Sequence, residues 1–280
     1  MKQFPIGVML ESFRMDTKES VELAAKMGAQ GLQMYATRGE HAPERMNAAA
    51  RRELLDLVKS YGLKFSALCG DFGHGFGDAA RNGELIERSK RVMELAKDLE
   101  TNIVTTHIGV VPADPSHPRY GIMQEACGIL SEYADTMQAH FAIETGPETA
   151  SVLKPFLDSL HSRGVAVNLD PANLVMVTGD DPVQAVYTLR DYIVHTHAKD
   201  GRKLLDRDPE IIYNIIEAEI QEGAAFEELP LGEGDVPFPA YLAALEDIGY
   251  SGYLTIEREV GENPQADIHT AVQYLKQIMG

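Results

Sequence analysis

The sequence predicts an α/β protein of the closed (β/α)₈ barrel class, in which each of eight parallel strands is followed by a helix. Short β-rich runs alternate with longer helical patterns along the whole chain, which is typical of a parallel sheet with helical crossovers. The 280 residues accommodate one such barrel, which needs about 250. Eight repeats in a chain of this length favour a closed barrel over an open sheet. We therefore expect a single domain over 1–280.

The predicted strands are runs of β-branched and other bulky apolar residues. They cover 6–10, 31–36, 64–70, 102–109, 140–146, 165–171, 192–199 and 252–259. In the seventh run, YIVHTHAK, an apolar start is followed by two histidines and a lysine. Because side chains alternate across a strand, His195, His197 and Lys199 share one face, which we expect to point toward the barrel axis.

The segments between the strands show helical patterns. Apolar residues spaced at i, i+3, i+4 and i+7 mark helices over 83–100 and 239–250. Glycine ends the predicted helices over 17–28 and 44–62. One long connection, 201–236, follows the seventh strand and contains a helix-like piece over 208–223. A connection of this length is usually functional, so we expect it to act as a lid over the barrel mouth.

Composition limits the classes of partner. A net charge of −18 argues against nucleic acid and against anionic membrane surfaces, since both attract basic proteins. Two cysteines cannot make a disulfide framework, so a reducing, cytoplasmic setting is expected. The N-terminal apolar run is too short for a membrane span and lacks a signal-peptide layout. A homo-oligomer is compatible with the sequence.

Four coordinating side chains stand at the ends of four successive strands. They are Glu144, Asp170, His197 and Glu257, and all should meet at the rim where barrel enzymes carry their sites. Three carboxylates at one rim would repel one another unless a cation joined them. Oxygen ligands with one imidazole suit one divalent ion, with Mn²⁺ as first choice and Mg²⁺, Co²⁺ or Zn²⁺ as alternatives. The other interpretation is an internal salt-bridge network without a metal.

Three further side chains are candidates for contact with a substrate. His107 ends the fourth strand, where it could bind a substrate oxygen or satisfy a hydrogen bond in the core. His74 lies in the glycine-rich loop CGDFGHGFGD and could reach a substrate or only solvent. Glu11 ends the first strand and could be a rim residue or a helix-capping charge.

Two charged residues near the long connection are also candidates. Lys199 could neutralise an oxygen of an enediolate intermediate or pair with Asp200. Glu233 lies in the sequence LGEGD, which should turn the connection back to the rim, and could touch a substrate or solvent.

The sequence resembles the xylose-isomerase-like TIM-barrel superfamily of sugar isomerases and epimerases, to which endonuclease IV also belongs. The matching motifs, in the family's order, are AIETG, NLDPANL, HTHAKDG, PLGEGDVPFPAYLAAL and GYLTIERE. The resemblance implies a metal held by Glu144, Asp170, His197 and Glu257, with the two glutamates acting as acid and base. Ketose 3-epimerases of this family carry a His three residues after the Asp and an Arg six after the His. Here Asn173 and Lys203 occupy those positions, which argues against 3-epimerase activity, and Asn173 is a candidate for binding substrate instead.

We therefore expect a metal-dependent isomerase or epimerase of a keto or aldehydo sugar that works through an enediolate. A dehydratase of the inosose or dehydroshikimate type begins with the same proton abstraction and is the nearest alternative. An AP-endonuclease-like hydrolase needs more histidines and a basic groove, which the net charge of −18 disfavours. A sugar-binding barrel without activity would require the metal site to be vestigial.

Overall fold

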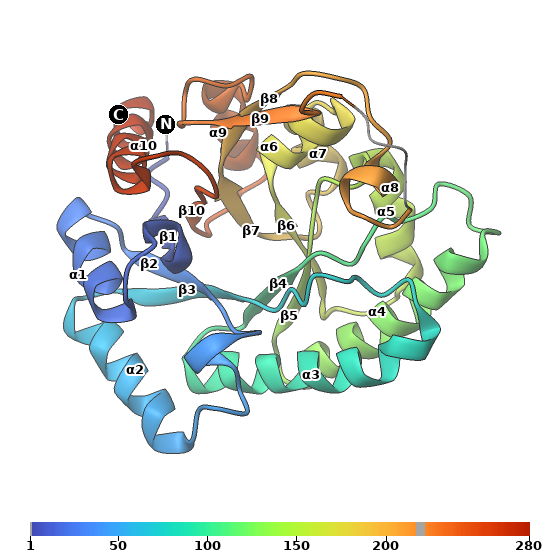
Figure 1. Ribbon diagram of the computed structural model, residues 1–280, viewed down its shortest axis with the longest axis horizontal. Helices are drawn as coiled ribbons and strands as arrows, with labels where there is room; N and C mark the ends of the chain where they lie inside the picture. Colours follow the sequence, from blue (N-terminus) through green and yellow to red (C-terminus); the bar gives the residue numbers. More distant parts are fainter. Residues whose placement is uncertain (1, 217–221) are drawn as a thin grey trace.

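Eight parallel strands close into a barrel in the computed structural model, which describes residues 2–216 and 222–280 (Figure 1). Around the barrel the order is β1, β10, β7, β6, β5, β4, β3 and β2. The bounds are β1 Ile6–Met9, β2 Gly31–Tyr35, β3 Lys64–Cys69, β4 Ile103–Thr106, β5 His140–Glu144, β6 Val165–Leu169, β7 Ile193–Ala198 and β10 Leu254–Ile256. Each strand lies within its predicted range, and the predicted fold class is confirmed.

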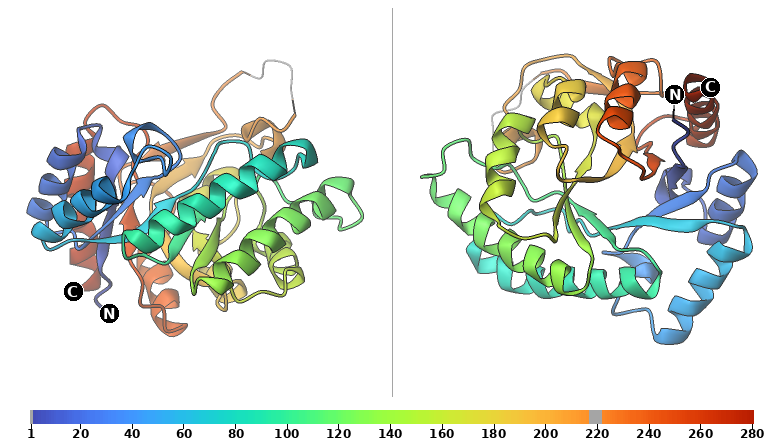
Figure 2. Two further views of the ribbon diagram at one scale, coloured as in Figure 1. Left: turned by 90° about the horizontal axis from the view of Figure 1, so that it is seen from below. Right: turned by 180° about the vertical axis from the view of Figure 1, so that it is seen from behind.

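Helices surround the barrel (Figures 1 and 2). The longer ones are α1 Thr17–Met27, α2 Ala48–Ser60, α3 Ala79–Asp98, α4 Pro118–Thr136, α5 Ala150–Ser159, α7 Pro182–Thr188, α9 Phe238–Asp247 and α10 Pro264–Met279. Short turns of helix are η1 Leu10–Phe13, η2 Gly39–His41, α6 Pro171–Asn173 and η3 Leu174–Thr178. Helix α3 begins at Ala79 rather than at residue 83, because the Asp78 carboxylate accepts a hydrogen bond from Ala80 N–H and caps it. No helix in the described part of the chain is long and apolar enough to cross a bilayer.

The apolar core lies between the strands and the helices. Its largest fully buried side chains include Phe13, Phe141, Phe156, Phe238 and Tyr241. The interior of the barrel is different, because it contains buried polar side chains. These are Gln33, Ser66, Thr105, Asn168, His195 and Thr255. Buried polar groups must find hydrogen-bond partners, and in this barrel they build a network that reaches the rim.

In its described residues, the long connection after β7 forms a small separate sheet and a short helix. Strands β8 Asp200–Lys203 and β9 Phe226–Leu229 pair antiparallel. Within the described part of the helix predicted over 208–223, the structure has α8, Pro209–Ile212. Asn214 takes a left-handed conformation, with φ of 55°, which cannot continue a right-handed helix. Residues 217–221 of the predicted helix lie outside the described residues.

Two carboxylates tie the base of the connection to the barrel. Asp200 accepts hydrogen bonds from the backbone N–H groups of Gly232 and Val236 at 2.8 and 3.1 Å. Glu228 of β9 accepts a 2.6 Å bond from Arg258 Nη1. The predicted lid is therefore anchored at its base, since its last strand and its return turn are part of the folded rim.

Candidate metal centre and active site

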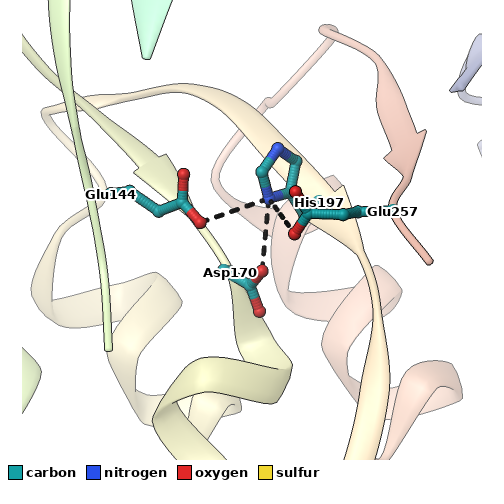
Figure 3. Close-up of side chains that lie close together, drawn as sticks. All are labelled: Glu144, Asp170, His197 and Glu257. Atoms are coloured by element: carbon teal, nitrogen blue, oxygen red, sulfur yellow. Dashed lines mark hydrogen bonds and ion pairs between the residues drawn. The ribbon is translucent and has the colours of Figure 1, made fainter. Parts of the chain in front are cut away.

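Four strands that are neighbours in the barrel bring their coordinating side chains together (Figure 3). Glu144 ends β5, Asp170 follows β6, His197 lies in β7 and Glu257 follows β10. One ligand atom from each lies within 4.8 Å of the others, and all four residues are buried. From His197 Nδ1 the distances are 3.5 Å to Glu144 Oε1, 3.2 Å to Asp170 Oδ2 and 3.4 Å to Glu257 Oε2. The structure thus brings together the whole predicted ligand set.

The second nitrogen of His197 is held by Gln33 of β2. Gln33 Oε1 lies 3.0 Å from His197 Nε2, and an amide oxygen can only accept a hydrogen bond. Gln33 Nε2 in turn donates to Thr105 Oγ1 at 2.9 Å, which fixes the orientation of the amide. His197 therefore carries a proton on Nε2, which leaves Nδ1, the nitrogen that faces the three carboxylates, as the one that can bind a metal.

A second chain of hydrogen bonds orients Glu144. Asn168 Nδ2 donates to Glu144 Oε2 at 3.1 Å, so the Asn168 oxygen faces His195 Nδ1, 2.8 Å away. His195 must then donate from Nδ1, and its Nε2 accepts from Thr255 Oγ1 at 2.9 Å. Burial lowers the pKa of His195 well below its usual value, so the ring is neutral. His195 is thus a positioning residue one layer below the ligands.

This donor set fits a divalent cation. Three buried carboxylate oxygens repel one another, and a cation removes that cost. Oxygen donors with one imidazole nitrogen suit Mn²⁺, Mg²⁺ and related ions. Because Gln33 holds a proton on Nε2 of His197, Nδ1, which faces the carboxylates, is the nitrogen that would be left to bind an ion. The cluster could therefore hold a metal ion.

Removing the amide of Gln33 should weaken metal binding. In the Gln33→Leu variant the His197 N–H loses its acceptor. We expect about 10–100-fold lower Mn²⁺ affinity, which is the usual effect of removing a residue that hydrogen-bonds to a metal ligand. The exposed Gln273 provides a control, Gln273→Leu, which should bind the ion like the parent protein. Titration calorimetry measures both. Equal affinity of the Gln33→Leu and parent proteins would show that Gln33 does not orient the ligand.

His107 extends the site from the end of β4. Its Nδ1 lies 3.3 Å from Asp71 Oδ2, and its Nε2 lies 3.6 Å from Glu144 Oε1 without a hydrogen-bond partner. Burial alone would lower the pKa of His107, but the carboxylates of Glu144 and Asp71 raise it to about 9. The ring also faces that of Tyr213, with 5.6 Å between centroids. A cationic N–H donor is thus available beside the four candidate metal ligands.

Lys199 lies beside Glu257 on the other side of the site. Its Nζ donates to Glu257 Oε2 at 3.0 Å and also contacts Glu259. Burial opposes the charged form, but the Glu257 and Glu259 carboxylates raise the pKa of Lys199 well above its usual value. The alternative prediction, pairing with Asp200, is wrong, because that carboxylate accepts hydrogen bonds from backbone N–H groups instead.

These side chains line a cavity of about 240 Å³ at the barrel mouth. Part of its wall is formed by His107, Glu144, Lys199 and Glu257. The long connection contributes Ile212, Tyr213 and Phe226. The connection therefore covers part of the mouth, as a lid does, although its base is fixed.

Residues 21–278 match the sequence profile of a family described as xylose isomerase-like TIM barrel. The chain belongs to the xylose isomerase-like TIM barrel family. Among curated relatives, the fructoselysine 3-epimerase of Escherichia coli O157:H7 is 22% identical over 253 residues, which are 87% of this chain and 86% of that protein. The uncharacterized protein MJ1311 of Methanocaldococcus jannaschii is 25% identical over 189 residues, and this match spans 62% of the chain and only 56% of the relative.

Several solved structures share the whole fold. A xylose isomerase domain protein from Planctomyces limnophilus has a TM-score of 0.80 at 23% identity, and the match covers 98% of this chain and 96% of that one. The probable 3-DHS dehydratase AsbF from Bacillus anthracis has a TM-score of 0.75 at 19% identity, covering 98% and 99%. A D-tagatose 3-epimerase-like protein has a TM-score of 0.74 at 18% identity, covering 98% of each chain. At these identities the likeness shows the fold.

Within this xylose isomerase-like barrel, Asn173 contacts two of the candidate ligands. Its backbone N–H donates to Asp170 Oδ1 at 2.8 Å, and its Nδ2 donates to Glu144 Oε1 at 3.3 Å. Lys203, the other departure from the 3-epimerase pattern, pairs with Asp206 at 2.6 Å. Asn173 lines the mouth cavity, whereas the side chain of Lys203 is engaged elsewhere.

Glu11 is a rim residue rather than a helix cap. Its Oε1 accepts a hydrogen bond from Tyr35 N–H at 2.9 Å, so the carboxylate joins η1 to the neighbouring strand β2. Burial raises the pKa of Glu11 to about 7. Glu11 lines a small cavity that shares Tyr35 and Glu257 with the mouth. A role in binding substrate stays a prediction for this residue.

The structure does not bring His74 and Glu233 to the four candidate metal ligands. His74 is exposed and lines a separate, neighbouring cavity. Glu233 is also exposed, in the return turn of the connection, where its backbone N–H donates to the Pro230 oxygen and its own backbone oxygen accepts from Arg202. Its predicted contact with substrate has no support from this position.

Sequence reasoning missed several residues of the site. Gln33 is a polar residue in the middle of an apolar strand, and this was a usable signal. Asn168 is likewise a polar residue in an otherwise apolar strand, β6. Asp71 and Tyr213 come from loops, and nothing in their local sequence indicates that they meet His107.

Proposed function

We propose that this protein is a divalent-metal-dependent sugar isomerase or epimerase that works through an enediolate on a keto or aldehydo sugar. The observation that carries the proposal is the placement of the two glutamates: Glu144 and Glu257 approach His197 from opposite sides (Figure 3). Moving a proton off one face of a carbon and returning it to the other face needs two such carboxylates. The fructoselysine 3-epimerase relative supports this class of reaction.

Glu144, Asp170, His197 and Glu257 would hold the metal, with Mn²⁺ as first choice and Mg²⁺, Co²⁺ or Zn²⁺ as alternatives. When bound, a divalent ion polarises a carbonyl and so acidifies the neighbouring C–H group. The small mouth cavity holds the sugar beside the two glutamates. One glutamate carboxylate takes the proton from carbon, and the other glutamate returns a proton to it.

The surrounding side chains prepare these carboxylates for proton transfer. Lys199 donates a hydrogen bond to Glu257, and the His107 ring beside Glu144 favours the ionised form of that carboxyl. Burial alone would raise the pKa of Glu144, but His107 and His197 hold it well below its usual range. His107 Nε2 and Asn173 Nδ2 are N–H donors in the cavity wall that can bind sugar oxygens.

A dehydratase is the second candidate. It would begin with the same proton abstraction and then lose water from the adjacent carbon. The similarity to the probable 3-DHS dehydratase favours this alternative, as does Asn173 at the position where ketose 3-epimerases carry a His.

Turnover in D₂O distinguishes these reactions. A panel of free and phosphorylated keto sugars is incubated with the protein and Mn²⁺, and the products are analysed by mass spectrometry. An isomerase or epimerase using carboxylate acid/base chemistry should give a product of unchanged formula that contains solvent deuterium. Loss of one water identifies the dehydratase. Turnover without any deuterium would contradict the acid/base roles of the glutamates and indicate a hydride shift.

A further inference from the structure

A second, larger cavity adjoins the mouth. It measures about 520 Å³, against about 240 Å³ for the cavity that contains the glutamates. Tyr213 lines both, so its side chain stands at their boundary. The walls come from the glycine-rich loop after β3, from the start of α4 and from residues 213–215 of the long connection. The proposed reaction needs only the smaller cavity and gives the larger one no role.

The glycine-rich loop is built to form this cavity. Gly75 has a φ of 62°, and a Cβ there would lie 2.5 Å from the Ile108 oxygen. Only glycine therefore lets the loop pack this closely on the segment after β4. The packing leaves His74 on the cavity wall rather than in the metal cluster. Asp71 at the start of the loop contacts His107 in the mouth cavity, whereas residues 73–78 lie along the larger cavity.

The wall of the larger cavity is polar and carries two arginines and one carboxylate, and Glu210 next to the wall adds a second carboxylate. Arg119 is ion-paired with Glu210, which links α4 to α8. Arg81 is accompanied on the wall by the carboxylate of Asp78. His74 and Asn214 add polar groups, and Met123 and Ile215 add apolar surface. A phosphate site would show an excess of cations, so this wall matches an uncharged, hydroxyl-bearing ligand with apolar faces.

We infer that the larger cavity is a subsite for a second, uncharged sugar unit joined to the sugar that reacts. The inference rests on the proposed function and specifies its substrate class. The mouth cavity, below the ~300 Å³ at which ligand pockets usually begin, holds one monosaccharide. A glycosidic link would pass beside Tyr213, which separates the two cavities. The substrate is therefore a keto glycoside or keto disaccharide rather than a free monosaccharide or a sugar phosphate.

Isomaltulose is the probe, because it carries a glucose unit on O6 of fructose and leaves the ketone and its neighbouring hydroxyl free. Saturation-transfer NMR with the Mg²⁺-loaded protein should show contact to protons of both rings. In the His74→Trp variant, which fills the larger cavity, the glucose signals should fall while the fructose signals persist. Arg81→Ala should have the same effect. Arg91→Ala, an exposed change on the same helix α3, is the matched control and should leave both sets unchanged.

Kinetics provide the second readout. Isomaltulose should be processed with kcat/KM at least about tenfold above D-fructose, and the two cavity variants should remove most of that advantage, since such contacts act on substrate selection. Saturation confined to the fructose ring, or a preference for fructose 6-phosphate, would overturn the subsite. Failure of the proposed function looks different: both rings would be saturated in the parent protein and the glucose signals would fall in the two variants, but no sugar would be converted.

Discussion

Replacing either Glu144 or Glu257 by Gln is expected to lower kcat by about 10²–10⁴-fold, the usual contribution of a general base. Glutamine keeps one oxygen donor and the shape of the side chain but cannot take up a proton. Metal binding should fall much less than kcat, because glutamine still offers an oxygen to the ion. Steady-state kinetics together with metal titration separate the two effects.

A control is provided by Glu148, a buried carboxyl outside the metal cluster. Burial raises its pKa to about 8, so at neutral pH it is mostly protonated and resembles glutamine. Its Oε2 accepts a hydrogen bond from Val111 N–H at 3.0 Å, and Gln can keep that bond through its oxygen. Glu148→Gln should therefore retain activity within about threefold, as changes away from the chemistry usually do.

The two glutamate variants should differ from each other in deuterium exchange. For an epimerase acting in one direction, the variant that keeps the abstracting carboxylate can still exchange the substrate C–H with solvent, and the other cannot. If both Gln variants kept near-parental kcat, the carboxylates would be structural ligands and the acid/base assignment would be wrong.

Removal of a ligand with the fold kept should abolish stoichiometric metal binding. We expect Asp170→Ala and His197→Ala to bind Mn²⁺ at least about 100-fold more weakly. This loss exceeds the usual loss of affinity when a residue that only hydrogen-bonds to a metal ligand is replaced. Asp170 also caps α6, because its Oδ1 accepts from Asn173 N–H at 2.8 Å. Asp170→Asn can retain that cap while removing the charge at Oδ2. It therefore tests the contribution of the Asp170 charge to metal binding without loss of the cap.

Elemental analysis and thermal melting measure this effect. Mn²⁺ should raise the melting temperature of the parent protein, since a ligand that binds only the native state stabilises it, and should not raise that of the variants. Asp180→Asn is the matched control, because Asp180 also accepts a backbone hydrogen bond, from Ala150 N–H at 2.7 Å, in a loop at the same end of the barrel. Unchanged metal content in both Asp170 and His197 variants would favour the salt-bridge network instead.

The sequence by itself determined the barrel and its ligand set. Strand alternation is a local property, because each side chain points to the face opposite its neighbours whatever the rest of the chain does. Four parallel strands therefore place these side chains at one rim of the barrel: Glu144, Asp170, His197 and Glu257. The alternation of strands and helices required that parallel arrangement.

Tertiary structure decided the residues that orient and enclose these ligands. Gln33 meets His197 only because the barrel closes, which places β2 across the interior from β7. Tyr213 reaches His107 because the long connection is tied back to the rim, and Lys199 pairs with Glu257 and Glu259 rather than with its neighbour Asp200. Several of these contacts join residues far apart in the chain. A buried polar group must have a hydrogen-bond partner, and the fold determines which partner lies within reach. No local pattern encodes that choice.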